Sequence, residues 1–334
     1  MTYNTLDRPH LEARLQRETL PRQTLSFYRY CQIDDPGGLR EELFQILESQ
    51  EVLGRVFLAS EGVNGQISVP KPNFLALKSV LEKIWPGLPL KTAVEEASPS
   101  FIKLVVKVRK KVVADGLDAG DYDMSDRGQH LNAAQWNEAI SSPESVIVDM
   151  RNYYESEVGR FEGAVCPDVD TFREQIPMVK DLLLEQKEKK ILLYCTGGIR
   201  CEKTAAYLRK NGFQDVNSLD GGIINYVNQV RKENLTNFFR GKNFVFDNRL
   251  GERITEEILS SCHQCGQPCD SHHNCANDGC HQLFIQCPSC NGRFSGCCSQ
   301  ECQNLYQVSS GERRRVKKRL STGRHHKSRL RPRI

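Results

Sequence analysis

The feature that most constrains the fold of this chain is the six-residue loop from Cys195 to Arg200. The apolar run before it, residues 191–194, predicts a buried strand, and residues 201–211 have the pattern of a helix. A strand, a glycine-containing turn and a helix start place several backbone N–H groups around one point, which makes an anion site at the positive end of the helix dipole. We therefore expect an α/β domain in which a parallel sheet is covered by helices.

Cys195 is the candidate nucleophile. A cysteine at a helix start beside a cation has a lowered pKa and exists largely as the thiolate, which is the nucleophilic form. Arg200 supplies that cation, and the alternative, a buried structural thiol, does not require two glycines and an arginine directly after it. We expect a thiolate that attacks a substrate or holds a sulfur atom. The predicted anion and substrate loop consists of Thr196, Gly197, Gly198 and Ile199.

The length of this loop separates two classes of cysteine enzyme. Cysteine phosphatases place five residues between the cysteine and the arginine, which makes a cradle wide enough for phosphate. Here there are four, and this shorter loop resembles that of the rhodanese-like sulfurtransferases.

The segment before the loop extends the resemblance to rhodanese domains. A predicted strand at 146–148 leads into Asp149, Arg151 and Glu155, in a D-x-R…E pattern that those domains share. We expect Asp149 and Arg151 to clamp the domain rather than to touch a substrate. Glu155 is a candidate partner for Arg200.

The N-terminal part predicts a separate unit with a ferredoxin-like, or acylphosphatase-like, fold. Its patterns follow the order β-α-β-β-α-β, which is typical of that fold. Asn64-Gly65, before the third strand, fits a hairpin turn, although it could equally shape a binding loop. Strands are expected at 25–31, 54–59, 66–69 and 101–113, and helices at 38–49 and 74–84.

The last of these strands carries a row of cations. Its apolar residues, from Ile102 to Val108, alternate with Lys103, Lys107, Arg109 and Lys111. One face of an antiparallel sheet packs on a core while the other faces water. The row is therefore either an ordinary solvated face or a platform for an RNA phosphate backbone.

Ten cysteines lie between residues 262 and 302. Two pairs have the C-x-x-C spacing that lets two thiolates share one tetrahedral zinc ion. Pairs one and three in chain order would bind one zinc ion and pairs two and four another, with Cys269, Cys297 and nearby histidines as spare candidates. A segment this short cannot build its own hydrophobic core, and bound metal would therefore stabilise its fold. The alternative to a metal site is a set of disulfides or of reduced thiols. The pairs are Cys262/Cys265, Cys275/Cys280, Cys287/Cys290 and Cys298/Cys302.

Composition bears on compartment and partners. The sequence has no signal-peptide pattern and no apolar run as long as a membrane span. We therefore expect the reducing cytoplasm, where clustered cysteines are metal ligands or catalytic groups.

Residues 313–333 contain eleven lysines and arginines and no acidic residue, so the net charge of +4 comes from this tail. We expect the tail to be disordered, either as a solubilising terminus or as an RNA-binding arm.

The order of these units resembles that of the bacterial tRNA uridine hydroxylases. The expected units are a ferredoxin-like domain at 1–118, a rhodanese-like catalytic domain at 128–236, a cysteine-rich region at 237–308 and the basic tail at 309–334. The resemblance covers nearly the whole chain and fades only in the tail. It rests on phrases that include Ser26-Phe27-Tyr28, Glu61-Gly62-Val63-Asn64, Asp149-Met150-Arg151-Asn152, Gly241-Lys242-Asn243-Phe244 and Cys262-His263-Gln264-Cys265.

The resemblance implies oxygen-dependent conversion of the wobble uridine of tRNA to 5-hydroxyuridine, with Cys195 essential. Molecular oxygen would be the co-substrate and tRNA the partner. The sequence shows no flavin or haem motif, and it identifies neither an iron site nor the electron donor. From the residues alone, we would instead predict sulfur transfer. A persulfide sulfurtransferase acting on tRNA or a protein, and a non-catalytic RNA-binding protein, stay open as alternatives.

Two mechanisms reconcile a rhodanese-like loop with hydroxylation. In the first, the Cys195 thiolate adds to C6 of uridine and makes C5 electron-rich, while loop N–H groups or Arg200 stabilise the charge on the base. In the second, Cys195 carries the oxygen atom itself, as a sulfenic acid or a peroxide-derived species, and Cys201 is a candidate to form a disulfide with it afterwards. The alternative role for Cys201 is packing within its helix.

Overall fold

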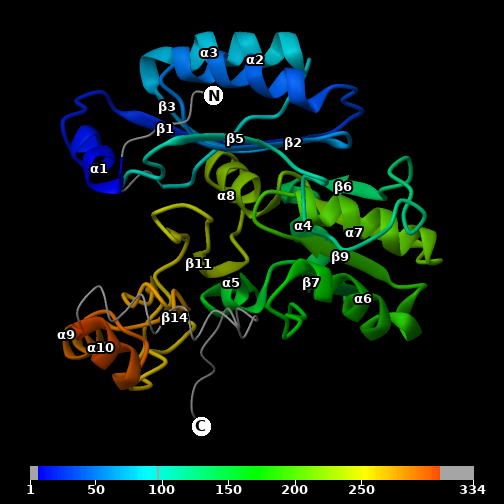
Figure 1. The fold of residues 1–334 in the computed structure, drawn as a ribbon. Helices are drawn as coiled ribbons and strands as arrows, with labels where there is room; N and C mark the ends of the chain where they lie inside the picture. Colours follow the sequence, from blue (N-terminus) through cyan, green and yellow to red (C-terminus); the bar gives the residue numbers. More distant parts are fainter. Residues whose placement is uncertain (1–6, 96–97, 309–334) are drawn as a thin grey trace.

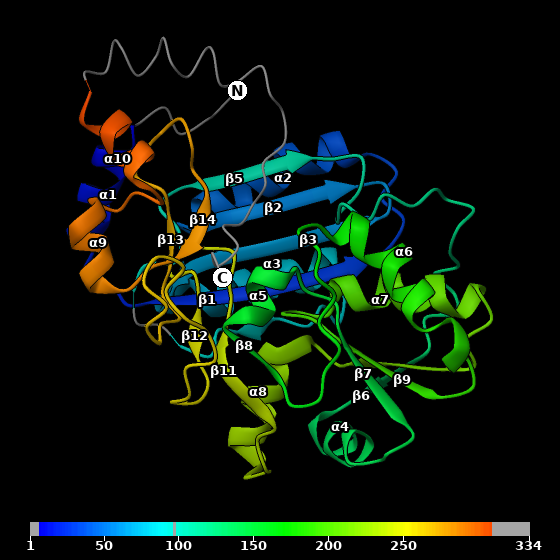
Figure 2. The same cartoon turned by 90° about the horizontal axis from the view of Figure 1, so that it is seen from below.

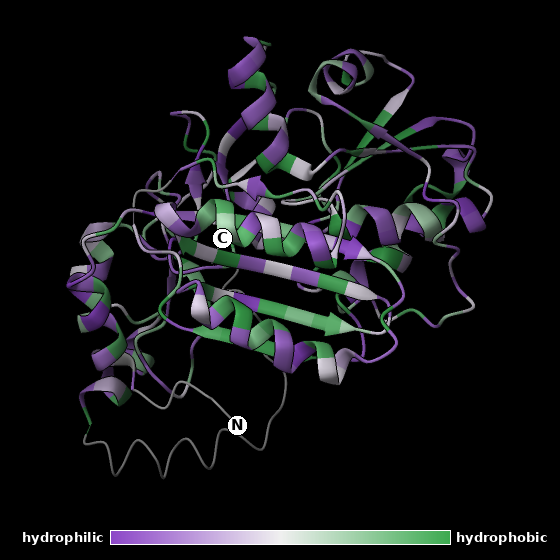
Figure 3. Ribbon diagram, turned by 90° about the horizontal axis from the view of Figure 1, so that it is seen from above, coloured by the Kyte–Doolittle hydropathy of each residue, from purple (hydrophilic) through white to green (hydrophobic). Residues whose placement is uncertain are grey.

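The computed structural model describes residues 7–95 and 98–308 (Figure 1); the basic tail lies outside these residues. The N-terminal unit is a five-stranded sheet in the order β4-β1-β3-β2-β5, with α2 and α3 on one face. Figure 3 shows hydrophobic and hydrophilic residues alternating along both helices, as expected for helices that pack one face on a sheet. The elements are α1 (Arg8–Gln16), β1 (Arg22–Tyr30), α2 (Pro36–Ser49), β2 (Leu53–Ala59), β3 (Gly62–Pro70), η1 (Lys71–Asn73), α3 (Phe74–Ile84), β4 (Lys91–Thr92) and β5 (Leu104–Val108).

The fourth strand of the ferredoxin-like arrangement is not where we predicted it. The edge position beside β1 belongs to the two-residue strand β4. The segment predicted as the last strand, 101–113, supplies only β5, which pairs in parallel with β2 at the opposite edge. Val108, predicted to face the core, is 47% exposed. A two-residue strand is too short to show an alternating pattern, so the sequence does not reveal β4.

The hairpin turn predicted at Asn64-Gly65 is also wrong. Strands β2 and β3 are joined by a turn at residues 60–61, and Asn64 and Gly65 lie inside β3. A Cβ on Gly65 would lie 2.3 Å from the ring of Phe27. Glycine stands there because another part of the molecule packs closely against the strand, not because a turn requires it.

The central unit is the predicted α/β domain. Its four strands, in the order β6-β10-β9-β7, are all parallel. One core, around Trp136 and Tyr226, and a second, around Ile176 and Leu208, are both fully buried. The elements are β6 (Gln129–Leu131), α4 (Ala133–Ile140), β7 (Ser145–Asp149), α5 (Tyr153–Glu157), β8 (Gly159–Phe161), α6 (Phe172–Leu182), η2 (Leu184–Gln186), β9 (Lys190–Tyr194), α7 (Ile199–Lys210), β10 (Asp215–Leu219) and α8 (Gly222–Glu233).

The C-terminal region is anchored on the central unit. Strand β11 (Phe239–Asn243) pairs with β8 on one side and with β12 (Glu252–Arg253) on the other. The cysteine-rich part follows as a small hairpin and two short helices. In Figure 2 this part overlaps one end of the N-terminal sheet in projection, but Figure 1 shows that it lies well away from that sheet, on the far side of β11. Its elements are β13 (His272–Asn274), β14 (Leu283–Ile285), α9 (Pro288–Phe294) and α10 (Gln300–Gln307).

Within the described ranges, no helix combines the length and the apolar character needed to cross a membrane.

Candidate active site

Cys195 lies where the central strand β9 ends and the loop to α7 begins, and its side chain is fully buried. The backbone N–H of Gly198 donates a hydrogen bond to its Sγ at 3.1 Å. Gly198 has φ +102°, and a Cβ there would lie 2.6 Å from the hydroxyl oxygen of Tyr28. Both the backbone conformation and the close approach of Tyr28 therefore require glycine at this position.

The surroundings of Cys195 favour its thiolate. Burial alone would raise the pKa of the thiol, but hydrogen bonds from the Cys201 thiol and from the N–H groups of Cys201 and Gly198, together with the charge of Arg200, lower this pKa to about 5. The Cys201 thiol has the opposite shift, because burial and its bond to Cys195 raise its pKa well above the ordinary value. At neutral pH the site therefore contains one thiolate and one thiol that donates to it.

Arg200 is neutralised by a carboxylate. Its Nη1 and Nη2 donate to Oε1 and Oε2 of Glu155 at 2.6 and 2.9 Å. The side chain of Glu155 is fully buried, and that of Arg200 is 10% exposed. The partnership suggested by the sequence is therefore present, and it holds α5 against the start of α7 while offsetting the charge of the guanidinium.

Asp149 and Arg151 form a second buried pair, away from the cavity described below. Nε of Arg151 donates to Oδ1 of Asp149 at 2.9 Å and Nη2 donates to Oδ2 at 2.6 Å. Nη2 also donates to the carbonyl oxygen of Gly159 at 2.6 Å. The pair thus ties the end of β7 to β8.

All three units meet at one cavity of ≈ 770 Å³. Cys195 and the loop residues Thr196, Gly197, Ile199 and Arg200 form its central wall. Residues of the N-terminal sheet and of the segment after β11 form the other walls. Among the other lining residues are Ser26, Tyr28, Arg55, Phe57 and Lys91 from the N-terminal unit, Arg173 and Ile224 from the central unit, and Val245, Phe246, Asp247, Arg249 and Glu252 from the C-terminal region.

Side chains of the N-terminal unit bond directly to helix α7. The hydroxyl of Tyr28 donates to Oε1 of Glu202 at 2.7 Å, and Nζ of Lys203 donates to Oε2 of Glu61 at 2.7 Å. Lys203 is fully buried. Sequence reasoning assigned no role to Tyr28, Glu61 or Lys91. The first two stand in phrases that carry the family resemblance, but no local signal marks Lys91.

Only part of the predicted row of cations on the N-terminal unit is exposed to solvent. Lys103, Lys107 and Arg109 are exposed, whereas Nζ of Lys111 pairs with the buried carboxylate of Asp115 at 2.7 Å. None of the four lines the cavity. The guanidinium of Arg109, however, lies over the ring of Phe57 at 5.5 Å, and that ring lines the cavity. The exposed cations therefore begin at the edge of the cavity.

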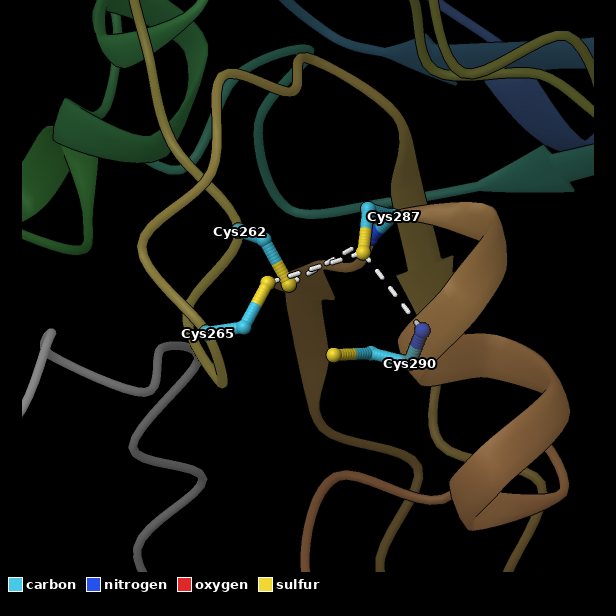
Figure 4. A group of neighbouring side chains, drawn as sticks. All are labelled: Cys262, Cys265, Cys287 and Cys290. Atoms are coloured by element: carbon cyan, nitrogen blue, oxygen red, sulfur yellow. Dashed lines mark hydrogen bonds between the residues drawn. The ribbon is translucent and has the colours of Figure 1, made fainter.

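The cysteine-rich region brings its cysteines together in the two groups that the sequence predicted. The first contains Cys262, Cys265, Cys287 and Cys290, whose Sγ atoms all lie within 4.8 Å of one another. Figure 4 shows the four thiols pointing toward a common centre. The second contains Cys275, Cys280, Cys298 and Cys302.

The sulfur separations fit zinc. A tetrahedral site with zinc–sulfur bonds of about 2.3 Å requires sulfur atoms about 3.8 Å apart. The separation is 3.7 Å between Cys265 and Cys287, 3.8 Å between Cys280 and Cys298, and 3.6 Å between Cys298 and Cys302. Both groups therefore have the donor set and the size of a structural zinc site.

Three known protein families match successive parts of the chain. Residues 22–112 match the UPF0176 acylphosphatase like domain, residues 132–229 match the Rhodanese-like domain, and residues 240–303 match the family described as Rhodanase C-terminal. These boundaries follow the three units of the structure.

Curated relatives match over nearly the whole length. The chain is 49% identical over 316 residues to the tRNA uridine(34) hydroxylase of Cronobacter sakazakii, which spans 94% of this chain and 90% of that protein. The protein of the same name from Citrobacter koseri is 50% identical over 303 residues, which cover 90% of this chain and 87% of that protein. The one from Leptospira interrogans is 46% identical over 336 residues, which cover 99% of this chain and 92% of that protein. The chain therefore belongs to the family of tRNA uridine(34) hydroxylases.

Proposed function

We propose that this chain hydroxylates C5 of the wobble uridine of tRNA, with Cys195 as the covalent catalyst and molecular oxygen as the source of the oxygen atom. The observation that supports this best is the Cys195 thiolate in the wall of a cavity shared by all three units. The relatives' names supply the target, uridine 34 of tRNA. A cavity of this size suits a single nucleotide turned out of its stack.

The first step is addition of the thiolate to the base. A lone pair of Sγ forms the bond to C6, and the π electrons of the C5–C6 double bond move toward C4 and its oxygen. The product is an enolate bonded to Cys195, in which C5 is a carbon nucleophile. The buried N–H groups that lower the pKa of Cys195 also hold the sulfur in place for this attack.

The second step is oxygen transfer to C5. Dioxygen first takes two electrons and two protons from a reductant and reaches the peroxide level. The carbon nucleophile then attacks one of the two oxygen atoms, so that the C5–O bond forms as the O–O bond breaks, and the second oxygen atom leaves as water after protonation. Loss of the proton on C5 then restores the C5–C6 double bond and expels the Cys195 thiolate. The thiolate is thus regenerated, and the base gains one oxygen atom.

The surface beside the cavity suits the rest of the tRNA. Lys103, Lys107 and Arg109 are exposed on the N-terminal unit, and Arg109 stacks on an aromatic ring of the cavity. Exposed cations in a row bind the phosphate backbone without sequence preference. We assign to them the positioning of the anticodon arm.

Zinc is the metal that we assign to the two cysteine groups. Cys262, Cys265, Cys287 and Cys290 would hold one ion, and the second group of four would hold another. Zinc would cross-link segments that have little apolar core of their own, and we assign it no part in the reaction.

The test is nucleoside mass spectrometry of tRNA from a deletion strain. Wild-type protein is expected to restore 5-hydroxyuridine derivatives and Cys195→Ser is not, because serine is not ionised at neutral pH. Cys31→Ser is the matched control, since Cys31 is a half-buried cysteine that does not line the cavity. Restoration by Cys195→Ser would refute the proposal.

A tRNA with 5-fluorouridine at position 34 tests the covalent step without an oxidant. Fluorine at C5 blocks the later steps, so a stable adduct on Cys195 should accumulate and be visible as a shifted band after denaturation. The absence of an adduct on a tRNA that is shown to bind would rule out addition to C6.

A further inference from the structure

The cavity contains a buried cation that the mechanism above does not use. Lys91 is 8% exposed and lines the cavity together with Cys195. Its Nζ lies 4.3 Å from the centre of the Tyr28 ring, a distance at which the ring face stabilises a positive charge. Among the described residues, no hydrogen-bond or ion-pair partner is found for this Nζ. A buried ammonium group without a partner is costly, so its retention here points to a ligand.

The other buried cations of the cavity are neutralised. Arg200 forms its two bonds to Glu155. Arg249 pairs with Asp247 at 2.6 Å and with Glu252 at 2.8 Å. Arg55, a half-buried cation of the lining, donates to the backbone carbonyl oxygen of Phe246. Within the described part of the lining, Lys91 is thus the buried cation for which no hydrogen-bond or ion-pair partner is found.

The position of Lys91 relative to Cys195 is set by contacts between units. Thr92, its neighbour in β4, accepts a hydrogen bond from Nδ2 of Asn228 in α8 at 2.9 Å. Two residues further, the carbonyl of Val94 accepts from Arg231 of α8 at 3.0 Å. The start of the same helix is tied to the catalytic loop, because the N–H of Ile223 donates to the carbonyl of Cys195 at 3.0 Å. Helix α8 therefore connects the strand of Lys91 to the loop of Cys195.

We propose that Lys91 donates a hydrogen bond to a carbonyl oxygen of the bound uracil and stabilises the negative charge that this oxygen gains when Cys195 adds to C6. The inference rests on the proposed function. Addition moves the charge of the thiolate through C5 and C4 to O4, and no atom is lost or gained. An ammonium group placed beforehand at that oxygen interacts more strongly with the product of this step than with the neutral base, which is the condition for lowering its barrier.

The charge state of Lys91 supports this role. Burial lowers the pKa of its ammonium group to about 8, against the opposing influence of Cys195, Asp220 and Glu202. The group is therefore mostly protonated at neutral pH and able to donate. Its burial in the cavity that Cys195 lines also favours the base over a tRNA phosphate, because the cations to which we assign phosphate contacts, such as Lys103 and Lys107, are exposed.

The rate of adduct formation with the 5-fluorouridine tRNA tests the inference, measured over a range of tRNA concentrations with the full chain. Lys91→Met is expected to lower the maximum rate about 100-fold, the loss seen when one oxyanion donor is removed, with little change in the half-saturating tRNA concentration. Lys91→Gln, a second neutral variant, should behave in the same way, and Lys91→Arg should recover about ten-fold because it keeps the charge. Lys83→Met is the control, because Lys83 is an exposed lysine of α3 outside the cavity.

Two outcomes would overturn the role of Lys91. One is an unchanged maximum rate in Lys91→Met. The other is a raised half-saturating concentration with an unchanged maximum rate, which would mean that Lys91 only binds the tRNA. Cys195→Ser is run beside these variants. If wild type forms no adduct, or if Cys195→Ser forms one, the proposed function is wrong. If wild type forms the adduct, Cys195→Ser does not, and Lys91→Met reacts as fast as wild type, only the inference about Lys91 is wrong.

Discussion

Glu155→Gln should destabilise the central unit more than any surface substitution. The carboxylate accepts bonds from Nη1 and Nη2 of Arg200 at 2.6 and 2.9 Å and from the N–H of Asn152 at 2.9 Å. Glutamine would place an NH₂ group against one of the guanidinium donors and leave a buried charge unpaired. Breaking a buried pair in this way costs about 3–5 kcal/mol. With a urea dependence of about 2 kcal/mol per molar, the unfolding midpoint should fall by about 2 M.

The assay needs a probe confined to the central unit. The chain has two tryptophans, of which Trp85 lies in the N-terminal core and Trp136 in the central core. In a Trp85→Phe background, the fluorescence of Trp136 reports unfolding of the central unit alone. Asp126→Asn is the matched control, because its pair with Arg209 is partly exposed, at 50% for Asp126 and 29% for Arg209, and a solvent-exposed ion pair is worth less than about 1 kcal/mol. Equal midpoint shifts for Glu155→Gln and Asp126→Asn would refute the reasoning.

Two further predictions concern protonation and metal. On the proposed mechanism, adduct formation needs Cys195 ionised and Lys91 protonated, so its rate should fall below pH about 5 and above pH about 8. Lys91→Arg should remove only the fall in rate above pH about 8. If that fall remains in the variant, its assignment to Lys91 is wrong. Purified full-length protein should contain two zinc ions by elemental analysis, one for each cysteine group. Cys290→Ser should lower the content to about one, whereas Cys269→Ser, outside both groups, should leave it unchanged; equal losses in the two variants would contradict the ligand set.

Local patterns were sufficient to predict the structure of the loop from Cys195 to Arg200 and the two groups of cysteines. The loop from Cys195 to Arg200 follows an apolar strand and precedes a helix, and both elements are where the pattern places them. The sequence also suggested which pairs of cysteines come together, the first with the third and the second with the fourth, and the structure groups them in this way. In both cases the residues that matter are neighbours in sequence or are linked by one strong chemical requirement.

Other features depend on contacts between residues far apart in the chain. Strand β4 is defined by its partner β1 rather than by any pattern of its own, and the segment predicted to be its equivalent pairs at the opposite edge of the sheet. Gly65 lies inside β3, where close packing against Phe27 demands glycine, and the turn between β2 and β3 comes earlier, at residues 60–61. Turn signals and alternation describe only the local chain, so they cannot separate these cases.

By itself, the sequence determined that this protein has a thiolate loop on a parallel sheet and two cysteine groups of zinc-site composition. The tertiary structure alone decided which cation is available to the substrate. Arg200, the obvious candidate beside Cys195, is neutralised by Glu155. Lys91, more than 100 residues away in the sequence, lines the same cavity, and among the residues that the structure describes its Nζ contacts the Tyr28 ring but no carboxylate. The physical reason is that a cation can interact with a substrate only if no carboxylate already pairs with it. Which cations are paired is decided when the three units pack together.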